Sequence, residues 1–212
     1  MTDAITRETF ADMIAAAAAL ARQHQAELCR LDSHGGDGDH GTTMARAMGQ
    51  AEQAAAKAEG GVSALLKDVG WAIMGIDGGA TGPLFGTLFT KMAAAAGDII
   101  DDSGALAAVF EAGLAGVRKR SKAQPGDKTL VDALTPAVEA LRAAAERGAT
   151  VREALDEAAK AAQQGAEATR AMRARFGRAK NLGEKSVGEQ DPGATSMAHL
   201  FAGFAQGVKH DA

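Results

Sequence analysis

Apolar side chains recur at helical spacing along most of the chain. Val62, Leu65, Leu66, Val69 and Ile73, for example, fall at i, i+3, i+4, i+7 and i+11, which places them on one face of a helix. Alternation of apolar and polar residues at period two, which is typical of a half-buried strand, is absent between the turn signals. The pattern therefore predicts an all-α protein with roughly eight helices.

Glycine, proline and polar turn signals divide this pattern into stretches of helical length. Pro136 falls inside one of them and is expected to kink or restart the helix. One segment, 176–190, is polar, basic and without periodicity, and such a stretch in a compact domain is usually a lid, a binding loop or disordered. We expect helices at about 6–28, 43–59, 62–73, 83–92, 103–117, 130–141, 150–175 and 192–208.

Chain length, net charge and cysteine content limit the class of protein to which this chain can belong. A chain of 212 residues is long enough for one sizeable domain, which we expect to span 1–212. The net charge of −4 and the pI near 5.7 give no general attraction to nucleic acid or to an anionic membrane surface. Cys29 is the single cysteine, and no apolar run suits a signal peptide or a spanning helix. We therefore expect a cytoplasmic protein.

Three carboxylates and four glycines are concentrated in residues 31–43. Asp32, Asp37 and Asp39 form D-x4-D-x-D, and acids this close repel one another unless a cation lies among them. Oxygen ligands without cysteine suit Mg²⁺ better than zinc. An EF-hand is excluded, because Gly41 and Met48 stand at the fifth and twelfth loop positions. A merely hydrophilic turn remains an alternative for this stretch taken alone.

Two other loops, 75–83 and 191–196, are rich in glycine and lead into predicted helices. A helix N-terminus offers free N–H groups and partial positive charge, so each of these loops is a candidate anion site, although the glycines also suit close helix packing. Arg178 or Lys185 of the basic segment is placed to close over bound charge. A P-loop is not supported, because the sequence around Lys128 lacks the Gly-Lys pair. Carboxylates, anion sites and basic residues together predict a magnesium–polyphosphate site.

The same motifs resemble the nucleotide-binding L subunit of dihydroxyacetone kinase, the DhaL type. They occur in the family's order over nearly the whole chain. The matching stretches are Asp32-x4-Asp37-Gly-Asp39-His40-Gly41, Gly78-Gly79-Ala80-Thr81-Gly82-Pro83-Leu84-Phe85-Gly86-Thr87, Pro125-Gly126-Asp127-Lys128-Thr129, Gly177-Arg178-Ala179, Leu182-Gly183-Glu184-Lys185-Ser186 and Asp191-Pro192-Gly193-Ala194-Thr195-Ser196. The sequence departs from the family's usual pattern at Ser33-His34-Gly35, Asp77, Ser121 and Leu130.

The resemblance implies an antiparallel barrel of eight helices that binds ADP or ATP through two Mg²⁺ ions at one end. By position, the metal ligands would be Asp32, Asp37 and Asp39. In the family the ketose is held by a histidine of a separate K subunit, so His40 is not assigned as a nucleophile and no catalytic residue is expected in this chain. The nucleotide contacts carried over by position are His40, Gly41, Thr42, Thr43, Ala80, Thr81, Ser121, Leu130, Arg178, Asp191, Pro192 and Gly193.

The function implied is delivery of the γ-phosphate to dihydroxyacetone or another short ketose held by a K-type subunit. The length of the chain favours the phosphotransferase-dependent form, in which a phosphocarrier protein rephosphorylates bound ADP in place. Two alternatives stay open: an ATP-exchanging two-subunit kinase for another ketose or sugar, and a nucleotide-sensing regulatory protein without transfer. Segment 176–190 is the expected docking site for a partner, and a homodimer is also open.

Overall fold

The computed structural model describes residues 4–208, which form α-helices joined by turns and two 3₁₀ helices. Ile5 and Ile100 make an isolated antiparallel bridge, and no strand occurs within the described residues. The helices are α1 (Arg7–Gln23), α2 (Gln25–Ser33), α3 (His40–Lys57), α4 (Val62–Met74), α5 (Thr81–Ala95), α6 (Ser103–Ser121), α7 (Val131–Glu146), α8 (Val151–Ala168), η1 (Thr169–Ala171), η2 (Arg178–Ser186) and α9 (Pro192–Gly207).

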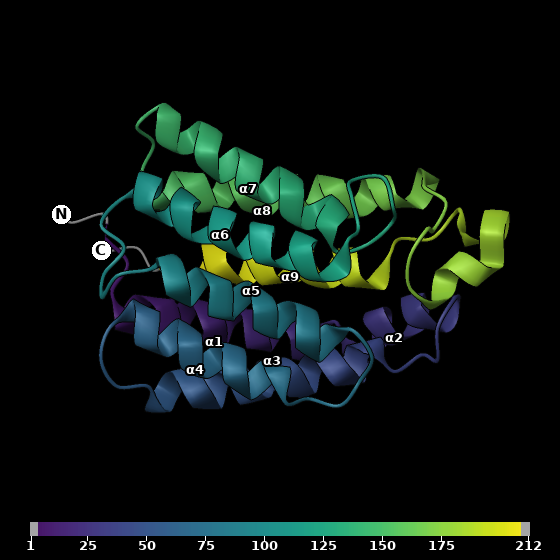
Figure 1. Ribbon diagram of the computed structural model, residues 1–212, viewed down its shortest axis with the longest axis horizontal. Coiled ribbons are helices and arrows are strands. Elements are labelled where there is room, and N and C mark those ends of the chain that lie inside the picture. The colour runs from purple at the N-terminus through teal and green to yellow at the C-terminus, as the bar shows by residue number, and fades with distance from the viewer. Residues whose placement is uncertain (1–3, 209–212) are drawn as a thin grey trace.

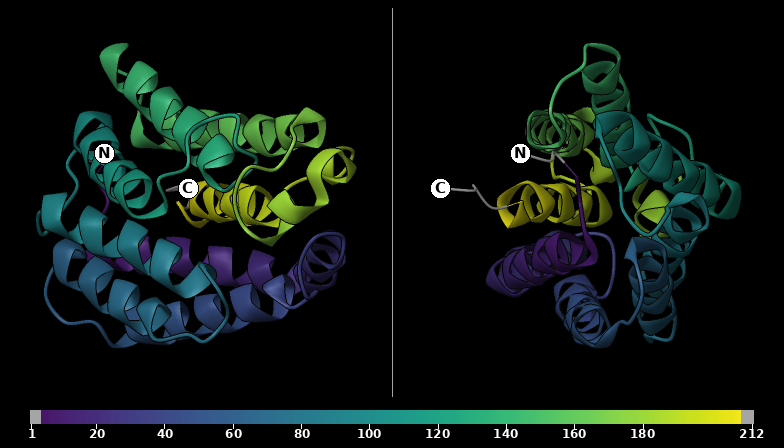
Figure 2. Two further views of the ribbon diagram at one scale, coloured as in Figure 1. Left: turned by 45° about the vertical axis from the view of Figure 1, so that its right-hand side comes forward. Right: turned by 90° about the vertical axis from the view of Figure 1, so that its left-hand side faces the viewer.

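Eight long helices close into a barrel. Each of α1, α3, α4, α5, α6, α7 and α8 contacts the next in that order, and α9 contacts both α8 and α1 to complete the ring. Figure 1 shows neighbouring helices running in opposite directions, and the end-on view of Figure 2 shows them arranged around a common interior. The predicted all-α barrel of antiparallel helices is confirmed. Within residues 4–208, no helix is both long and apolar enough to cross a membrane.

Several predicted boundaries were wrong. The first predicted helix is two helices, because the chain turns at His24, where neither glycine nor proline marks the break. The helix predicted for 43–59 begins three residues earlier, at His40. The long helix predicted to reach 175 ends at Ala168, and η1 follows it. The helix does not restart at Pro136, because α7 continues to Glu146 with Pro136 inside it; the kink expected there stays a prediction.

The basic segment 176–190 contains a 3₁₀ helix, although its sequence has no periodicity and predicted no regular structure. Residues 178–186 form η2, and the Ser186 hydroxyl holds it in place. That hydroxyl accepts from the Ala174 N–H at 2.9 Å and donates to the Gly183 carbonyl at 2.6 Å. Gly188 then donates to the Arg170 carbonyl at 2.8 Å, which ties the end of the segment back to η1. Tertiary hydrogen bonds, which leave no periodic signal in sequence, fix this region.

Aromatic side chains fill the barrel interior. Phe204 of α9 is fully buried, and its ring contacts those of Phe10, Phe89, Phe110 and Phe201, with centroids 5.8–6.4 Å apart. Most of these pairs are edge-to-face, the arrangement that aromatic quadrupoles favour. The rings come from α1, α5, α6 and α9, so one cluster joins helices from all round the ring.

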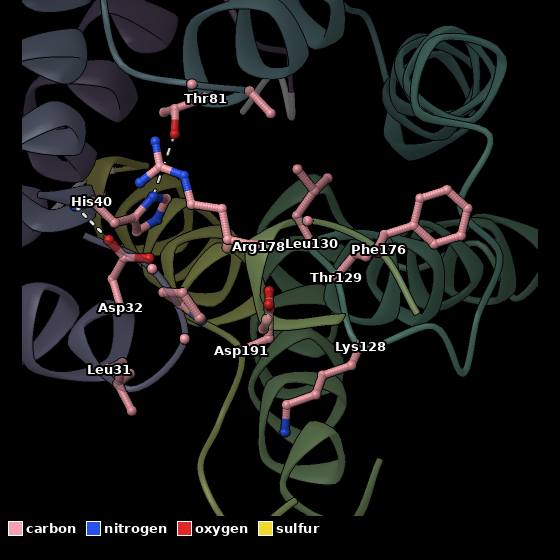
Figure 3. A pocket seen from close by; sticks show the side chains of 18 of the residues that line it. Leu31, Asp32, His40, Thr81, Lys128, Thr129, Leu130, Phe176, Arg178 and Asp191 are labelled. Atoms are coloured by element: carbon pink, nitrogen blue, oxygen red, sulfur yellow. Dashed lines mark hydrogen bonds between the residues drawn. The ribbon is translucent and has the colours of Figure 1, made fainter. Parts of the chain in front are cut away.

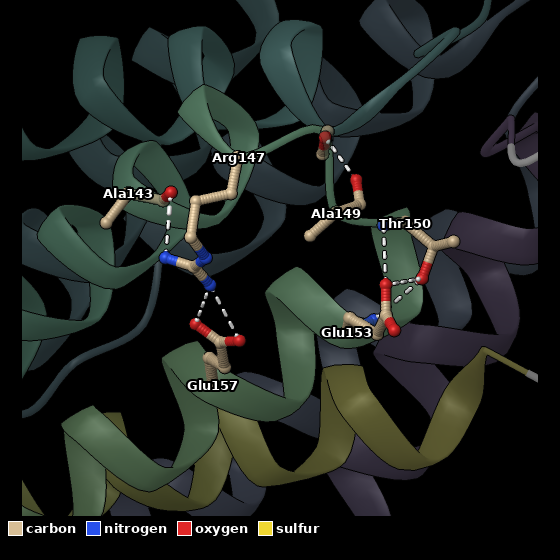
Figure 4. A network of polar contacts seen from close by, with 7 residues as sticks. Ala143, Arg147, Ala149, Thr150, Glu153 and Glu157 are labelled. Atoms are coloured by element: carbon tan, nitrogen blue, oxygen red, sulfur yellow. Dashed lines mark hydrogen bonds and ion pairs between the residues drawn. The ribbon is translucent and has the colours of Figure 1, made fainter.

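The turn between α7 and α8 lies at one end of the barrel and is closed by polar contacts (Figure 4). Thr150 and Glu153 form a capping box, in which each side chain accepts a backbone N–H of the other residue. Arg147 donates to the Ala143 carbonyl at 2.9 Å and to both oxygens of Glu157 at 2.7 and 2.8 Å. These contacts stabilise the end of the barrel that carries no candidate site.

Close packing of α9 against α1 depends on glycine. A Cβ added at Gly203 would lie 2.3 Å from the Cα of Ala17, a backbone atom that cannot move aside cheaply. We predict that Gly203→Ala lowers the free energy of unfolding by about 1–3 kcal/mol, the usual cost of overpacking. For a chain of this size that corresponds to a melting temperature lower by several degrees, roughly 2–4 °C per kcal/mol, measured by circular dichroism.

Gly49→Ala is the matched control, because a Cβ at Gly49 of α3 would meet no atom within 4 Å. Alanine is favoured over glycine by up to about 1 kcal/mol inside a helix, so this variant should melt at the same temperature or higher. Equal melting temperatures for the two variants would contradict the packing account.

Candidate functional site

Five segments meet at the end of the barrel opposite the α7–α8 turn (Figure 1). They are the α2–α3 loop, the loop before α5, the α6–α7 loop, the segment that includes η2, and the start of α9. Together they line a cavity of about 470 Å³. Small-molecule sites usually fall between roughly 300 and 1,000 Å³, so the cavity has room for a ligand of nucleotide size.

Most of the residues predicted for the site line this cavity. They are Asp32, Asp37, Asp39, His40, Ala80, Thr81, Ser121, Leu130, Arg178, Asp191, Pro192 and Gly193. Their roles toward a ligand remain predictions.

Gly41, Thr42, Thr43 and Lys185 do not line the cavity. Gly41 packs against α2, since a Cβ there would lie 2.0 Å from the Gln25 carbonyl oxygen. Thr42 also faces α2, and its hydroxyl accepts from Gln25 Nε2 at 3.2 Å. Thr43 is buried beside the loop before α5. These placements follow from the start of α3 at His40, which turns the next positions toward neighbouring helices.

The Asp32 carboxylate shapes the loop that carries the other two acids. Its Oδ2 atom accepts from the backbone N–H groups of Gly38, Asp39 and His40 at 2.9, 3.1 and 3.3 Å. Gly36 must be glycine here, because a Cβ would lie 2.2 Å from Asp32 Oδ1. The loop therefore folds around one carboxylate, which brings oxygens of Asp32, Asp37 and Asp39 within 4.8 Å of one another.

Charge in this cluster is only partly compensated. Arg178 forms an ion pair with Asp37, and that hydrogen bond lowers the pKa of Asp37 to about 2. Asp39 behaves in the opposite way, because burial and then the neighbouring Asp37 and Asp32 carboxylates raise its pKa. Arg178 thus supplies one positive charge against three carboxylates. A net negative charge remains where the three carboxylates converge. Converging carboxylate oxygens with unbalanced charge fit Mg²⁺, which prefers oxygen ligands.

His40 is the first residue of α3, and its two ring nitrogens are hydrogen-bonded to residues near the starts of α5 and α9. His40 Nε2 is hydrogen-bonded to the Ser196 hydroxyl of α9 at 2.6 Å, and Nδ1 to the Thr81 hydroxyl of α5 at 3.3 Å. The Ser196 hydroxyl also lies 2.9 Å from the Pro192 carbonyl, which favours a neutral ring with its hydrogen on Nε2. Burial lowers the pKa of His40, which agrees with this neutral form. Since both nitrogens are hydrogen-bonded, the ring is a positioning group here rather than a free nucleophile.

The N-termini of α3, α5, α7 and α9 all lie at the cavity, because alternate helices of the barrel begin at this end. Such ends supply free N–H groups and partial positive charge for anions. Asp191 caps α9 by accepting from the Ala194 N–H at 2.7 Å. Burial raises the pKa of Asp191 to about 7. At neutral pH this carboxyl group therefore carries only part of a negative charge.

The two sides of the cavity differ in character (Figure 3). Asp32, His40 and Arg178 lie together on one side, whereas Leu130 and Phe176 lie on the other. The charged side suits phosphate and metal. The apolar side suits a planar base, because aromatic and aliphatic walls contact flat rings favourably.

Sequence reasoning missed several residues that build the site. Lys128 is buried and donates to the carbonyls of Thr169 and Glu189, each at 2.6 Å, so it ties η1 to the approach of α9. Asp132 accepts from the N–H groups of Gly126 and Thr129 at 2.5 and 2.7 Å and so folds the α6–α7 loop. Lys128 stands in a polar loop and looks solvent-exposed, and Asp132, although it lies in an apolar stretch, carries no local signal of the loop contacts that it makes.

Comparison with known proteins bears directly on this arrangement. The DAK2 domain family matches residues 34–206, most of the chain. The chain belongs to the DAK2 domain family. This DAK2 domain is 40% identical over 187 residues to the ADP-binding subunit DhaL of the PEP-dependent dihydroxyacetone kinase of Escherichia coli, covering 86% of this chain and 88% of that protein.

A second relative of this DAK2 domain is the ADP-binding subunit DhaL of the PTS-dependent dihydroxyacetone kinase of Lactococcus lactis. It is 36% identical over 181 residues, which are 85% of this chain and 86% of that protein. Among solved structures, the dihydroxyacetone kinase of C. freundii in complex with AMP-PNP and Mg²⁺ matches with a TM-score of 0.69 and 27% identity. That match covers 92% of this chain but only 33% of the longer kinase.

The partly buried Asp191 predicts a pH-dependent stability. Its pKa is raised from 3.8 to about 7 in the folded state, so its protonation favours the folded protein at low pH, and that contribution is lost as pH rises toward 7. We expect Asp191→Asn, which keeps an N-cap acceptor, to gain melting temperature relative to the unmodified protein as pH rises from 5 to 8. Scanning calorimetry without nucleotide or metal would measure this difference.

Asp102→Asn is the control for that experiment. Asp102 caps α6 in the same way, accepting from the Ala105 N–H at 2.8 Å, but it is exposed. Its difference from the unmodified protein should stay constant over the same pH range. If the Asp191→Asn difference is equally constant, the carboxyl group is ionised throughout and the burial argument fails.

Proposed function

We propose that this chain is the ADP- and ATP-binding, phosphoryl-donating subunit of a dihydroxyacetone kinase, acting on a ketose held by a separate K-type subunit. The observation that carries the proposal is the convergence of Asp32, Asp37 and Asp39 on a cavity that also receives four helix N-termini. The names of the DhaL relatives supply the reaction and its dependence on PEP or the PTS. The nucleotide-binding domain spans residues 1–212 in this proposal.

In this proposal Asp32, Asp37 and Asp39 would hold two Mg²⁺ ions, which would supply the positive charge that neutralises the phosphate groups of bound nucleotide. The N–H groups at the starts of α5 and α9 donate hydrogen bonds to further phosphate oxygens. Arg178 exchanges its contact with Asp37 for one with the transferred phosphate, because a metal ion at the aspartates competes for the same carboxylate. His40 fixes the positions of Thr81 and Ser196 relative to each other through its two hydrogen bonds. Leu130 and Phe176 contact the base.

In this proposal the acceptor is held by another chain. Covalent capture of a ketose needs an accessible nucleophile, and His40 has both ring nitrogens engaged by Ser196 and Thr81. His34 also lines the cavity and is exposed, so the separate K-type subunit is inferred from the relatives, each named as the ADP-binding subunit of a dihydroxyacetone kinase. A K-type subunit and a phosphocarrier both approach the same opening, over the exposed part of segment 176–190.

Binding of nucleotide is tested through stability. With Mg²⁺ and ADP at about a hundred times its dissociation constant, mass action adds about 2.7 kcal/mol, which raises the melting temperature of a domain this size by roughly 5–10 °C. We expect Asp37→Asn to lose most of this rise, because a metal ligand is lost. Asp37 is half-exposed, so the substitution should leave the fold intact.

Asp101→Asn makes the same charge change outside the site, in the exposed turn before α6, and should keep the full rise. An equal rise without Mg²⁺, or in Asp37→Asn, would remove the basis for the proposed metal site.

Transfer is tested by reconstitution. The chain is loaded with ADP, freed of unbound nucleotide, and mixed with a K-type subunit, dihydroxyacetone and a phosphorylated carrier protein. We expect dihydroxyacetone phosphate to accumulate over many turnovers, because the bound ADP is rephosphorylated in place. Asp37→Asn should give at least a tenfold lower rate, roughly the 1.4 kcal/mol or more expected for loss of a metal ligand.

An ATP-exchanging kinase is the second candidate, favoured by the match to the C. freundii kinase solved with AMP-PNP and Mg²⁺. In that case free ATP supports product formation and the phosphorylated carrier does not. If nucleotide binds but neither donor yields product, the chain is a nucleotide-sensing regulatory protein and the kinase proposal is wrong.

A further inference from the structure

A second group of potential metal ligands lies outside the cavity. His24 stands at the turn between α1 and α2, Glu27 lies in the first turn of α2, and His199 lies on α9. Their ligand atoms all fall within 4.8 Å of one another. Glu27 Oε2 is 2.8 Å from His24 Nδ1 and 3.8 Å from His199 Nε2. None of the three lines the nucleotide cavity.

Ordinary packing explains only part of this group. His24 Nδ1 and Glu27 Oε2 are hydrogen-bonded at 2.8 Å across the start of α2, and the rings of His24 and His199 stack with centroids 4.1 Å apart and planes 18° apart. His199 Nε2 remains unexplained, because it is buried and has no hydrogen-bond partner among the described residues. A buried nitrogen without a partner is unusual in a folded protein and requires an explanation.

We propose that His24, Glu27 and His199 bind a transition-metal ion of the zinc type. Zinc ligands lie about 2.0–2.2 Å from the ion in a tetrahedral arrangement, so neighbouring ligand atoms are separated by roughly 3.3 Å. The two measured separations from Glu27 Oε2, 2.8 and 3.8 Å, lie on either side of that value. Because the His24 and His199 rings are stacked with planes 18° apart, the site forms when one imidazole rotates so that both ligand nitrogens point toward a common centre.

The chemistry of the ligands selects the ion. Two imidazole nitrogens and one carboxylate oxygen suit zinc and related metals, whereas Mg²⁺ prefers oxygen alone. Histidine must be neutral to bind a metal. Burial, and then the neighbouring His24 ring, lower the pKa of His199 to about 4, so a proton does not compete at neutral pH. The chain therefore offers two sites with different metal preferences.

The surroundings of His24, Glu27 and His199 leave space for a cation, and no arginine pairs with the Glu27 carboxylate among the described residues. Glu27 and His24 are 43% and 31% exposed in their side chains, so an ion can enter from solvent and keep a water as its fourth ligand. The arginines on either side pair elsewhere: Arg22 contacts Glu52 at 2.8 Å, and Arg30 contacts Glu189 at 3.4 Å. No arginine contact of Glu27 occurs among the ion pairs of the described residues.

A bound ion would join the α1–α2 turn to α9. Asp32 lies in the last turn of α2, and Ser196 of α9, the partner of His40, lies one turn before His199. The site would therefore fix the position of α2 relative to α9 next to the nucleotide cavity. This role does not depend on the proposed kinase reaction.

The test is metal binding to the full chain with Mg²⁺ and ADP in excess, so that the aspartates are occupied. Co²⁺ is the first probe, because tetrahedral Co²⁺ gives visible absorption bands, and Zn²⁺ is then titrated to displace it. We expect one ion per chain, a melting temperature raised by Zn²⁺, and affinity at least tenfold weaker in His24→Ala, Glu27→Gln and His199→Asn. Glu27→Gln is the most informative variant, because its exposed side chain should not be needed for folding.

Glu52→Gln is the matched control, since it removes a carboxylate from a neighbouring exposed position on α3 and should bind Co²⁺ with unchanged affinity. Three results would overturn the proposal: no stoichiometric binding, binding that is unchanged in Glu27→Gln, or an intense near-ultraviolet thiolate band. The last result would place the ion at Cys29 instead.

Discussion

The repulsion among three carboxylates gathered at one end of a barrel is the constraint on which the functional end of this protein depends. Asp32 is anchored by three backbone N–H groups, so it cannot turn away from the other two. One arginine balances Asp37 and leaves Asp39 with a raised pKa. The fold holds these charges together by the packing energy of its apolar interior, which makes the loop a preformed acceptor for positive charge.

The barrel also explains why the anion-binding groups lie beside these acids. In an antiparallel ring every second helix begins at the same end, so α3, α5, α7 and α9 direct their N-termini toward the cavity. Their partial positive charges therefore lie at the same cavity as the carboxylates. A ligand that carries both Mg²⁺ and phosphate satisfies the two sets at once. The membership of the chain in the DAK2 domain family agrees with this complementarity.

Much of the fold and of the candidate site could be predicted from the sequence. The predictions that were wrong failed for physical reasons. Apolar spacing and glycine-rich turns indicated the long helices, and the motifs at their starts indicated which residues would gather. The break at His24 and the end of α8 depend on packing between helices, which has no local signal. The start of α3 at His40 turned Gly41 and Thr42 onto α2. Lys128 and Ser186 became structural through contacts with residues distant in sequence.

The packing of Phe204 against four other rings limits how partner proteins can reach the cavity. Those aromatic side chains fill the barrel axis, so the structure provides no passage through the middle from the α7–α8 end to the cavity. Under the proposed function, the phosphocarrier and the subunit that holds the ketose would therefore reach the nucleotide through the same opening. They could not occupy it together, so rephosphorylation and transfer would alternate.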